Sequence, residues 1–172
     1  MMATLTGTDL TRISTEASET FVEAFYTALN GFRNQIKSFY VNTQTTAPGR
    51  SLPHISYNGE LLHDAGAFQD RFEKQMPWTH FEPQSVDVHV LSPSLGAVDA
   101  KASKRDLERN LSLTVQVSGY VRLVERKDGP MRGFSDSFVL VPNKEEITGK
   151  AAGRQENGKR FLIQSQNFRF VV

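Results

Sequence analysis

Hydrophobic residues recur at helical spacing through the first part of the chain. Between residues 10 and 29 they return every three or four positions, which predicts one long amphipathic helix. Thr8 or Asp9 can cap its start, and Gly31 suits the left-handed backbone position after its end. The same spacing, on a shorter scale, predicts a second helix over residues 32–40.

Turn residues then separate these helices from a third one. Residues 42–53 are polar and rich in turn formers, which predicts a connecting loop. Asn58 and Gly59 follow a short apolar stretch and both tolerate positive φ, so a β-hairpin is predicted around them. Asp64 caps the next amphipathic segment, which Pro77 prevents from continuing.

After Trp78 the period of the hydrophobic pattern changes from near 3.6 to 2. Alternating segments predict strands at residues 85–91, 111–123, 133–142 and 160–172. Gly119 lies in the middle of the second strand and indicates a bulge or a sharp bend there. Helices that precede an antiparallel meander predict an α+β domain whose helices pack on one face of the sheet.

The composition fits one globular domain over residues 1–172. The chain has 38% hydrophobic and 23% charged residues, and it has no cysteine, which excludes disulfides and thiolate zinc sites. No stretch approaches the roughly 20 apolar residues of a membrane helix, so we expect a soluble, intracellular protein without membrane contact. Long polar stretches predict flexible loops near 42–53, 92–110 and 143–158.

The strand at residues 111–123 carries an unusual set of polar side chains. Gln116, Ser118 and Tyr120 alternate with the apolar positions, and few charges accompany them. A solvent-facing strand usually carries Lys and Glu, whereas charges are depleted from the centre of protein interfaces. The second sheet face is therefore predicted to bind a partner.

Arg169 lies between Phe168 and Phe170 in the last predicted strand. Since successive side chains of a strand point to opposite faces, the two phenylalanines can fill the core while the guanidinium reaches the other face. Water, a neighbouring side chain or another protein could receive it. A bidentate pair with a partner's carboxylate would be strongly directional.

Five segments, in this order, together resemble the nuclear transport factor 2 family. They are ASETFVEAFYTALN, ISYNGELL, FEKQMP, PMRGFSDSFVLVPN and SQNFRF, and the likeness runs from about residue 9 to residue 170. The resemblance implies a cone in which three helices pack in a strongly bent, mostly antiparallel sheet. A Ran-importing function is not expected, because the turn before the GF strand, residues 125–132, is basic rather than acidic.

Within the family, the sequence is similar to the non-catalytic small subunits of heterodimeric mRNA export receptors. This similarity implies binding to the large receptor subunit, with the arginine that matches Arg169 paired to an acidic residue. It also implies nuclear pore Phe-Gly repeat proteins as partners through the complex, and residence in the nucleus and at the pore with shuttling to the cytoplasm. The predicted interface comprises Gln116, Ser118, Tyr120, Phe134, Asp136, Phe138, Gln164, Gln166 and Arg169.

Two alternatives to this function stay open. Basic loops could hold RNA or a pre-ribosomal particle through phosphate contacts; their residues are Lys101, Lys104, Arg105, Arg109, Lys150, Arg154, Lys159 and Arg160. An isomerase or dehydratase of the same fold would need a general base in an apolar cavity, and Asp136 between two phenylalanines is the best candidate for it. No motif for a cofactor or a phosphate loop is present, and we expect no catalysis.

Overall fold

The computed structural model of the protein describes residues 2–144 and 159–171, which begin with a long helix. Helix α1 (Gly7–Gly31) is capped by Thr6, one turn earlier than the sequence indicates. The Thr6 hydroxyl accepts from the Asp9 amide at 3.1 Å, and the Asp9 carboxylate accepts from the Thr6 amide at 2.9 Å. Asp9 thus completes a capping box from inside the helix rather than capping it alone.

Three shorter helical segments follow α1. The second predicted helix is the 3-10 helix η1 (Arg33–Phe39), and α2 (Ala65–Lys74) begins at Asp64, whose carboxylate accepts from the Ala67 amide at 2.8 Å as expected. A short α3 (Lys104–Glu108) lies in the segment 92–110, for which a loop is predicted. None of the helices in the described residues is both long and apolar enough to cross a membrane.

The main sheet has the strand order β4-β3-β8-β7-β6-β5. Only β3 and β8 run parallel, and the other neighbouring strands are antiparallel. Its strands are β3 (His54–Tyr57), β4 (Glu60–Leu62), β5 (Thr79–Ser92), β6 (Ser112–Leu123), β7 (Met131–Pro142) and β8 (Phe161–Val171). The hairpin at Asn58 and Gly59 and the four later strands are therefore confirmed.

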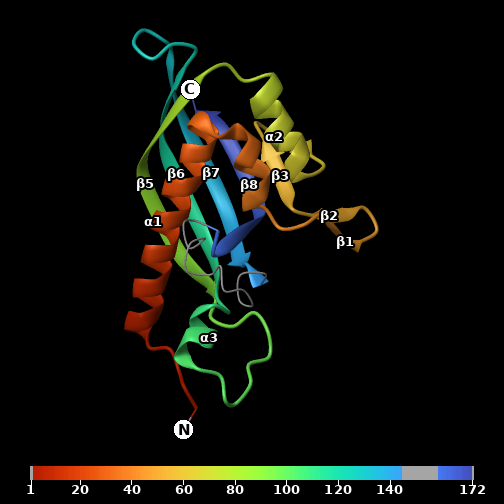
Figure 1. Cartoon of the computed structure of the whole chain (residues 1–172), viewed down its shortest axis with the longest axis vertical. Helices are drawn as coiled ribbons and strands as arrows, with labels where there is room; N and C mark the ends of the chain where they lie inside the picture. Colours follow the sequence, from red (N-terminus) through yellow and green to blue (C-terminus); the bar gives the residue numbers. More distant parts are fainter. Residues whose placement is uncertain (1, 145–158, 172) are drawn as a thin grey trace.

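Residues 42–53 differ from the predicted loop. They contain a separate two-stranded sheet, β1 (Gln44–Ala47) with β2 (Arg50–Leu52), which projects from the side of the molecule in Figure 1. Gly49 has φ 75° in its turn, a backbone angle that favours glycine. Most side chains of this hairpin are exposed, so it lacks the apolar period that would have marked it as strands.

The helices cover one face of the main sheet, which we call the inner face; the opposite face is the outer face (Figure 1). Aromatic side chains dominate the space between helices and sheet. Phe25 of α1 packs edge to face on Phe138 of β7, with ring centroids 5.4 Å apart, and Phe134 packs on Phe81 at 5.1 Å. Such pairs stabilise a core beyond the area that they bury.

Arg33 fastens the helices to the start of β5. Its guanidinium donates to the carbonyl oxygens of Phe72 at 2.8 Å, Met76 at 2.9 Å and Pro77 at 2.6 Å. These acceptors lie at and beyond the C-terminal end of α2, where the helix leaves carbonyl groups without intrahelical partners. One side chain at the start of η1 thus satisfies the end of another helix.

Register shifts in β5 and β8 interrupt the regular alternation of side chains in the main sheet. In β5 the register shifts between Pro83 and Ser85, directly opposite Gly119 of β6. A Cβ atom on Gly119 would lie 2.1 Å from the carbonyl oxygen of Glu82, so only glycine allows this close approach. The bend predicted at Gly119 is present, but the extra residue, Gln84, belongs to the neighbouring strand.

Candidate partner-binding face

The outer face carries short polar side chains in cross-strand rows. One row consists of Ser85, Ser118, Ser135 and Arg169, and the next of Asp87, Gln116, Ser137, Asn167 and Ser56. The first row runs from β5 to β8, and the second runs from β5 to β3. Asp87 and Arg169 are the charged residues of these two rows.

Gln116 organises the centre of the outer face. Its Nε2 donates to the Ser135 hydroxyl at 2.8 Å, and its Oε1 accepts a short hydrogen bond from the Ser137 hydroxyl. The amide therefore bridges two residues of the neighbouring strand and holds its own side chain flat against the sheet. Ser118, one step along β6, is exposed beside it.

Arg169 projects from the outer face. Its backbone pairs with Ser135, and its side chain is exposed while Phe168 before it is completely buried. No ion pair of Arg169 forms among residues 2–144 and 159–171. Arg169 is the one arginine in the two rows named above. Its exposed guanidinium can be reached by a partner's carboxylate.

Three residues of the predicted interface lie on the wrong side of the sheet. Phe134, Asp136 and Phe138 are buried on the inner face, at 1%, 0% and 2% exposure, and cannot contact a partner. The side chains of a strand alternate between its two faces. Asp136 therefore lies on the same, buried face as Phe134 and Phe138. Ser135 and Ser137, which lie between them, occupy the outer face instead.

Gln164 and Gln166 also leave the predicted interface. The register of β8 shifts between Ile163 and Ser165, which places Gln166 on the inner face at 1% exposure. Gln164 is the extra residue at this bulge, and it is partly buried. Gln166 and Arg169 are three residues apart with no bulge between them, so alternation alone points them in opposite directions.

Asp136 is the centre of a buried polar network rather than of an open site. Its carboxylate accepts from the Tyr26 hydroxyl at 3.0 Å and from Gln166 Nε2 at 3.0 and 3.1 Å, and Gln166 in turn accepts from Tyr40. Burial raises the pKa of Asp136 well above its ordinary range, although both hydrogen-bond donors act to lower it. Burial also raises the pKa of Tyr26 and Tyr40.

The same geometry bears on the enzyme alternative. Asp136 has no exposed atoms, and its oxygens already accept hydrogen bonds from Tyr26 and Gln166. A general base must lie within hydrogen-bond reach of its substrate. A substrate could approach Asp136 only if the surrounding aromatic side chains moved apart.

A shallow hollow lies on the outer face beside the central rows. It has a volume of about 260 Å³, and polar residues of four strands line it, including His89, Thr114, Ser137 and Asn167. Val115 and Val139 also line this hollow. A protruding side chain of a partner would find room here without displacing the sheet.

The basic residues proposed for RNA binding are dispersed over separate contacts. Lys104 pairs with Asp9 at 2.9 Å, and Lys159 lies 5.2 Å above the Phe39 ring. Arg160 lies 5.9 Å from the centre of the Phe161 ring, and Arg105 belongs to α3. Lys150 and Arg154 fall outside the described residues. The structure therefore gathers no single basic surface from the described members of this set.

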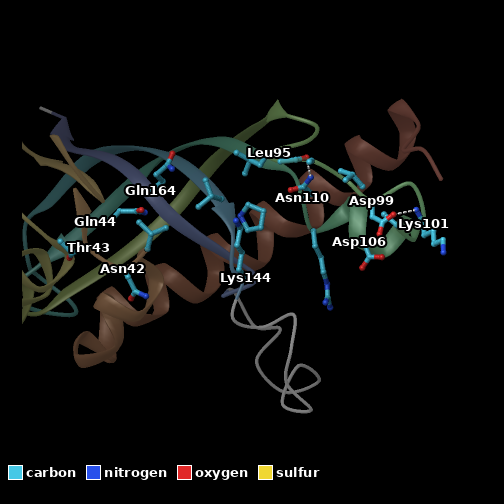
Figure 2. Close-up of a pocket in the computed structure, with 18 residues that line it drawn as sticks. Asn42, Thr43, Gln44, Leu95, Asp99, Lys101, Asp106, Asn110, Lys144 and Gln164 are labelled. Atoms are coloured by element: carbon cyan, nitrogen blue, oxygen red, sulfur yellow. Dashed lines mark hydrogen bonds between the residues drawn. The ribbon is translucent and has the colours of Figure 1, made fainter. Parts of the chain in front are cut away.

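Lys101 and Arg109 instead line a long pocket of about 980 Å³ (Figure 2). The pocket runs from Asn42, Thr43 and Gln44 to the segment that contains Asp99 and α3, as Figure 2 shows. Its cations are accompanied by Asp99 and Asp106, whose carboxylates accept from backbone amides of their own segment. Acidic and basic groups are mixed along it.

Comparison with solved structures identifies the fold. A structure named as the Chaetomium thermophilum Mex67 NTF2-like domain complexed with Mtr2 matches with a TM-score of 0.75 and 22% identity over 92% of this chain and 99% of that chain. A structure of Mtr2 matches with a TM-score of 0.68 and 21% identity over the same shares, 92% and 99%. This chain has the nuclear transport factor 2-like fold.

The nuclear transport factor 2-like fold is shared with proteins of another kind. A candidate scytalone dehydratase from Novosphingobium aromaticivorans matches with a TM-score of 0.59 and 10% identity, over 96% of this chain and 89% of that one. No protein-family model and no curated protein sequence matches the chain. Because one fold supports unrelated functions, the residues of the outer face indicate the function better than the fold does.

Sequence reasoning missed part of this face. Ser135, Ser137 and Asn167 lie in its central rows, yet none of them was among the predicted interface residues. The pattern FSDSF contained the signal, because phenylalanines assigned to the core leave both serines on the opposite side. For Asn167 the signal was the alternation at the end of β8, because Asn167 lies two residues before Arg169.

Proposed function

We propose that this chain is the non-catalytic small subunit of a heterodimeric mRNA export receptor. In this role it binds the matching nuclear transport factor 2-like domain of the large subunit through the outer sheet face. The observation that carries the proposal is the exposed Arg169 within a face otherwise poor in charge. The complex would act in the nucleus and at nuclear pores, shuttle to the cytoplasm and contact Phe-Gly repeat proteins.

The fold and the outer face support this proposal in different ways. Two matching structures are named for Mtr2, and one of them contains a Mex67 NTF2-like domain in complex with it. The outer face offers Gln116, Ser118 and Asn167 as exposed hydrogen-bonding groups. Arg169 can form a two-point contact with a carboxylate, which fixes the orientation of a partner as well as attracting it.

The inner face supports a role without catalysis. Asp136, the best candidate base, is enclosed by the core and bound to Tyr26 and Gln166. In this arrangement the carboxylate links α1 to β7 and β8. The network therefore serves the fold, and the exposed chemistry lies on the opposite side of the sheet.

Arg169→Glu tests the proposal. Co-expression with the large receptor subunit, followed by size exclusion and calorimetry, should show co-elution of the original chain and loss of the complex for the variant. Removing one side of a desolvated charge pair costs about 2–5 kcal/mol, and a reversed charge adds repulsion. Nuclear accumulation of polyadenylated RNA in cells that carry only the variant would connect the contact to export.

Arg50→Glu is the matched control, because Arg50 is an exposed arginine on the separate β1–β2 hairpin. Its complex should remain intact. Equal co-elution of the original chain and the Arg169→Glu chain would remove Arg169 as the anchor. Absence of any complex with the original chain would reject the proposed function itself.

A further inference from the structure

One end of the outer face carries three exposed apolar side chains, next to Glu82 on β5 and Arg122 on β6. Tyr120 of β6, Met131 of β7 and Val171 of β8 are 53%, 52% and 48% exposed. They belong to three neighbouring strands. Each side chain projects to the outer face, because the residues next to it in its strand point to the inner face. We call these three residues the apolar patch.

Gly133 lies at the centre of the apolar patch. Its backbone pairs with Tyr120 on one side and with Val171 on the other. Neighbouring strands are about 4.8 Å apart, so the side chains of Tyr120 and Val171 are separated by roughly 10 Å with only a glycine between them. The row of side chains therefore has a gap about one side chain wide.

A side chain at Gly133 itself would contact Val171, its neighbour on β8. A Cβ atom at Gly133 would lie 3.3 Å from the carbonyl oxygen of Val171 and 3.5 Å from its Cβ. These are tight but tolerable contacts with a residue near the end of its strand. The fold itself does not need glycine here as strictly as at Gly119.

Arg122 lies beside Met131 of the apolar patch, and its guanidinium is bound to the loop between β6 and β7. Its Nη1 donates to the carbonyl oxygens of Gly129 at 3.0 Å and Lys127 at 3.2 Å. These bonds turn the guanidinium towards the loop between β6 and β7, and Nη2 contacts only the sulfur of Met131 at 3.0 Å. Arg122 keeps its charge, but backbone carbonyls of this loop accept the hydrogen bonds of its Nη1, and the exposed Glu82 lies opposite Tyr120 on β5.

The apolar patch is continuous with the polar rows that contain Arg169. Val171 follows Arg169 by two residues on the same face of β8, and Tyr120 follows Ser118 in the same way on β6. Stable interfaces combine a desolvated apolar centre with few directional polar contacts, and tyrosine is among the residues most often found to dominate the binding energy. The polar rows alone lack such a centre.

We propose that the large receptor subunit inserts an apolar side chain over Gly133, between Tyr120 and Val171, and that the apolar patch is the energetic centre of this interface. The inference rests on the proposed function and adds residues to it. Arg169 then sets the orientation of the partner beside the patch. The occupant is an aliphatic or aromatic side chain on the sheet of the partner's matching domain.

The affinity of the heterodimer for Tyr120→Ser and Gly133→Leu, measured by calorimetry with the full-length large subunit, tests this proposal. Loss of the tyrosine ring should weaken binding at least about 30-fold, the effect of a residue that dominates an interface. Leucine at Gly133 should fill the gap and weaken binding at least about 10-fold. Val171→Asp, at the exposed end of β8, provides a third variant that does not depend on the core.

Phe32→Ser is the matched control for Tyr120→Ser. Phe32 is equally exposed at 53%, but it lies at the C-terminal end of α1 on the helical side of the molecule. Its removal should leave the affinity unchanged. Thermal unfolding of each isolated variant verifies that the comparison is made between folded chains.

The outcomes separate the two proposals. If the original chain binds the large subunit and Arg169→Glu abolishes binding while the patch variants bind normally, the patch proposal is overturned and the proposed function stands. If the original chain does not bind at all, the proposed function fails. If the isolated chain forms a dimer that Gly133→Leu dissociates while receptor binding persists, the patch serves self-association and the proposal is overturned.

Discussion

The two faces of strands β6, β7 and β8 share a backbone but differ in chemistry. On the inner face Phe168 is stacked on Tyr57 with ring centroids 5.3 Å apart, and on the outer face its neighbour Arg169 has no ion pair among the described residues. The inner residues are matched to each other across helices and strands. The outer residues have only some of their contacts within the chain. This difference distinguishes a surface that stabilises the fold from one that can bind a partner.

The difference also determines how each face tolerates a change. A buried aromatic ring touches partners on several elements, so its removal leaves a cavity that the surrounding side chains fill only partly. An exposed side chain of the outer face can be replaced with little effect on folding, because water takes its place. Stability measurements should therefore respond to the inner face, and binding measurements to the outer face.

The largest effect on stability is expected for Phe168→Ala. Phe168 is completely buried and packs against the rings of Tyr57, Phe134 and Phe170. Its loss should lower the free energy of unfolding by about 3–5 kcal/mol, measured by urea denaturation. The adjacent Arg169→Ala should stay within about 0.5 kcal/mol of the original chain, and equal losses would contradict the division between the faces.

A pair of glycines tests the division within one sheet. Gly119→Ala forces a Cβ atom to 2.1 Å from the Glu82 carbonyl oxygen, whereas at Gly133 the nearest atom is at 3.3 Å. The first substitution should lower the free energy of unfolding by about 1–3 kcal/mol or more through displacement of the bulge. The second should have a small effect on the same measurement, and the reverse order would show that the bulge does not need Gly119.

A pH-dependent effect is expected from Asp136. Since burial raises its pKa in the folded chain above the ordinary value near 3.8, the folded state holds a proton that the unfolded state releases. Stability from this group is complete below about pH 4 and is lost as the pH rises towards the folded-state pKa.

Asp136→Asn cannot ionise, so its stability relative to the original chain should rise with pH across this window. Urea denaturation at a series of pH values measures the difference, and Asp87→Asn, an exposed residue of the outer face, is the control. A constant difference between pH 4 and pH 8 would mean that Asp136 is ionised in the folded chain, and hence that the polar network offsets the effect of burial.

Several features of the site could be derived from the residues alone. Strict alternation placed Gln116, Ser118 and Tyr120 on the outer face, and it placed Arg169 opposite Phe168, because no bulge interrupts β6 or the end of β8. The same rule failed for Gln166, which a bulge separates from Phe161. Phe134, Asp136 and Phe138 were assigned to one side correctly, but alternation cannot tell which side the helices cover.

The sequence by itself determined the order of the main helices and strands, the cap at Asp64, the Asn58 hairpin and the presence of a polar sheet face, because these depend on local periods and turn geometry. Only the tertiary structure decided where the bulges lie, which face receives Asp136, and that Arg33 closes the end of α2. Those outcomes depend on contacts between segments far apart in the chain. A local pattern of residues does not specify such contacts, because it does not show which side of the sheet the helices cover.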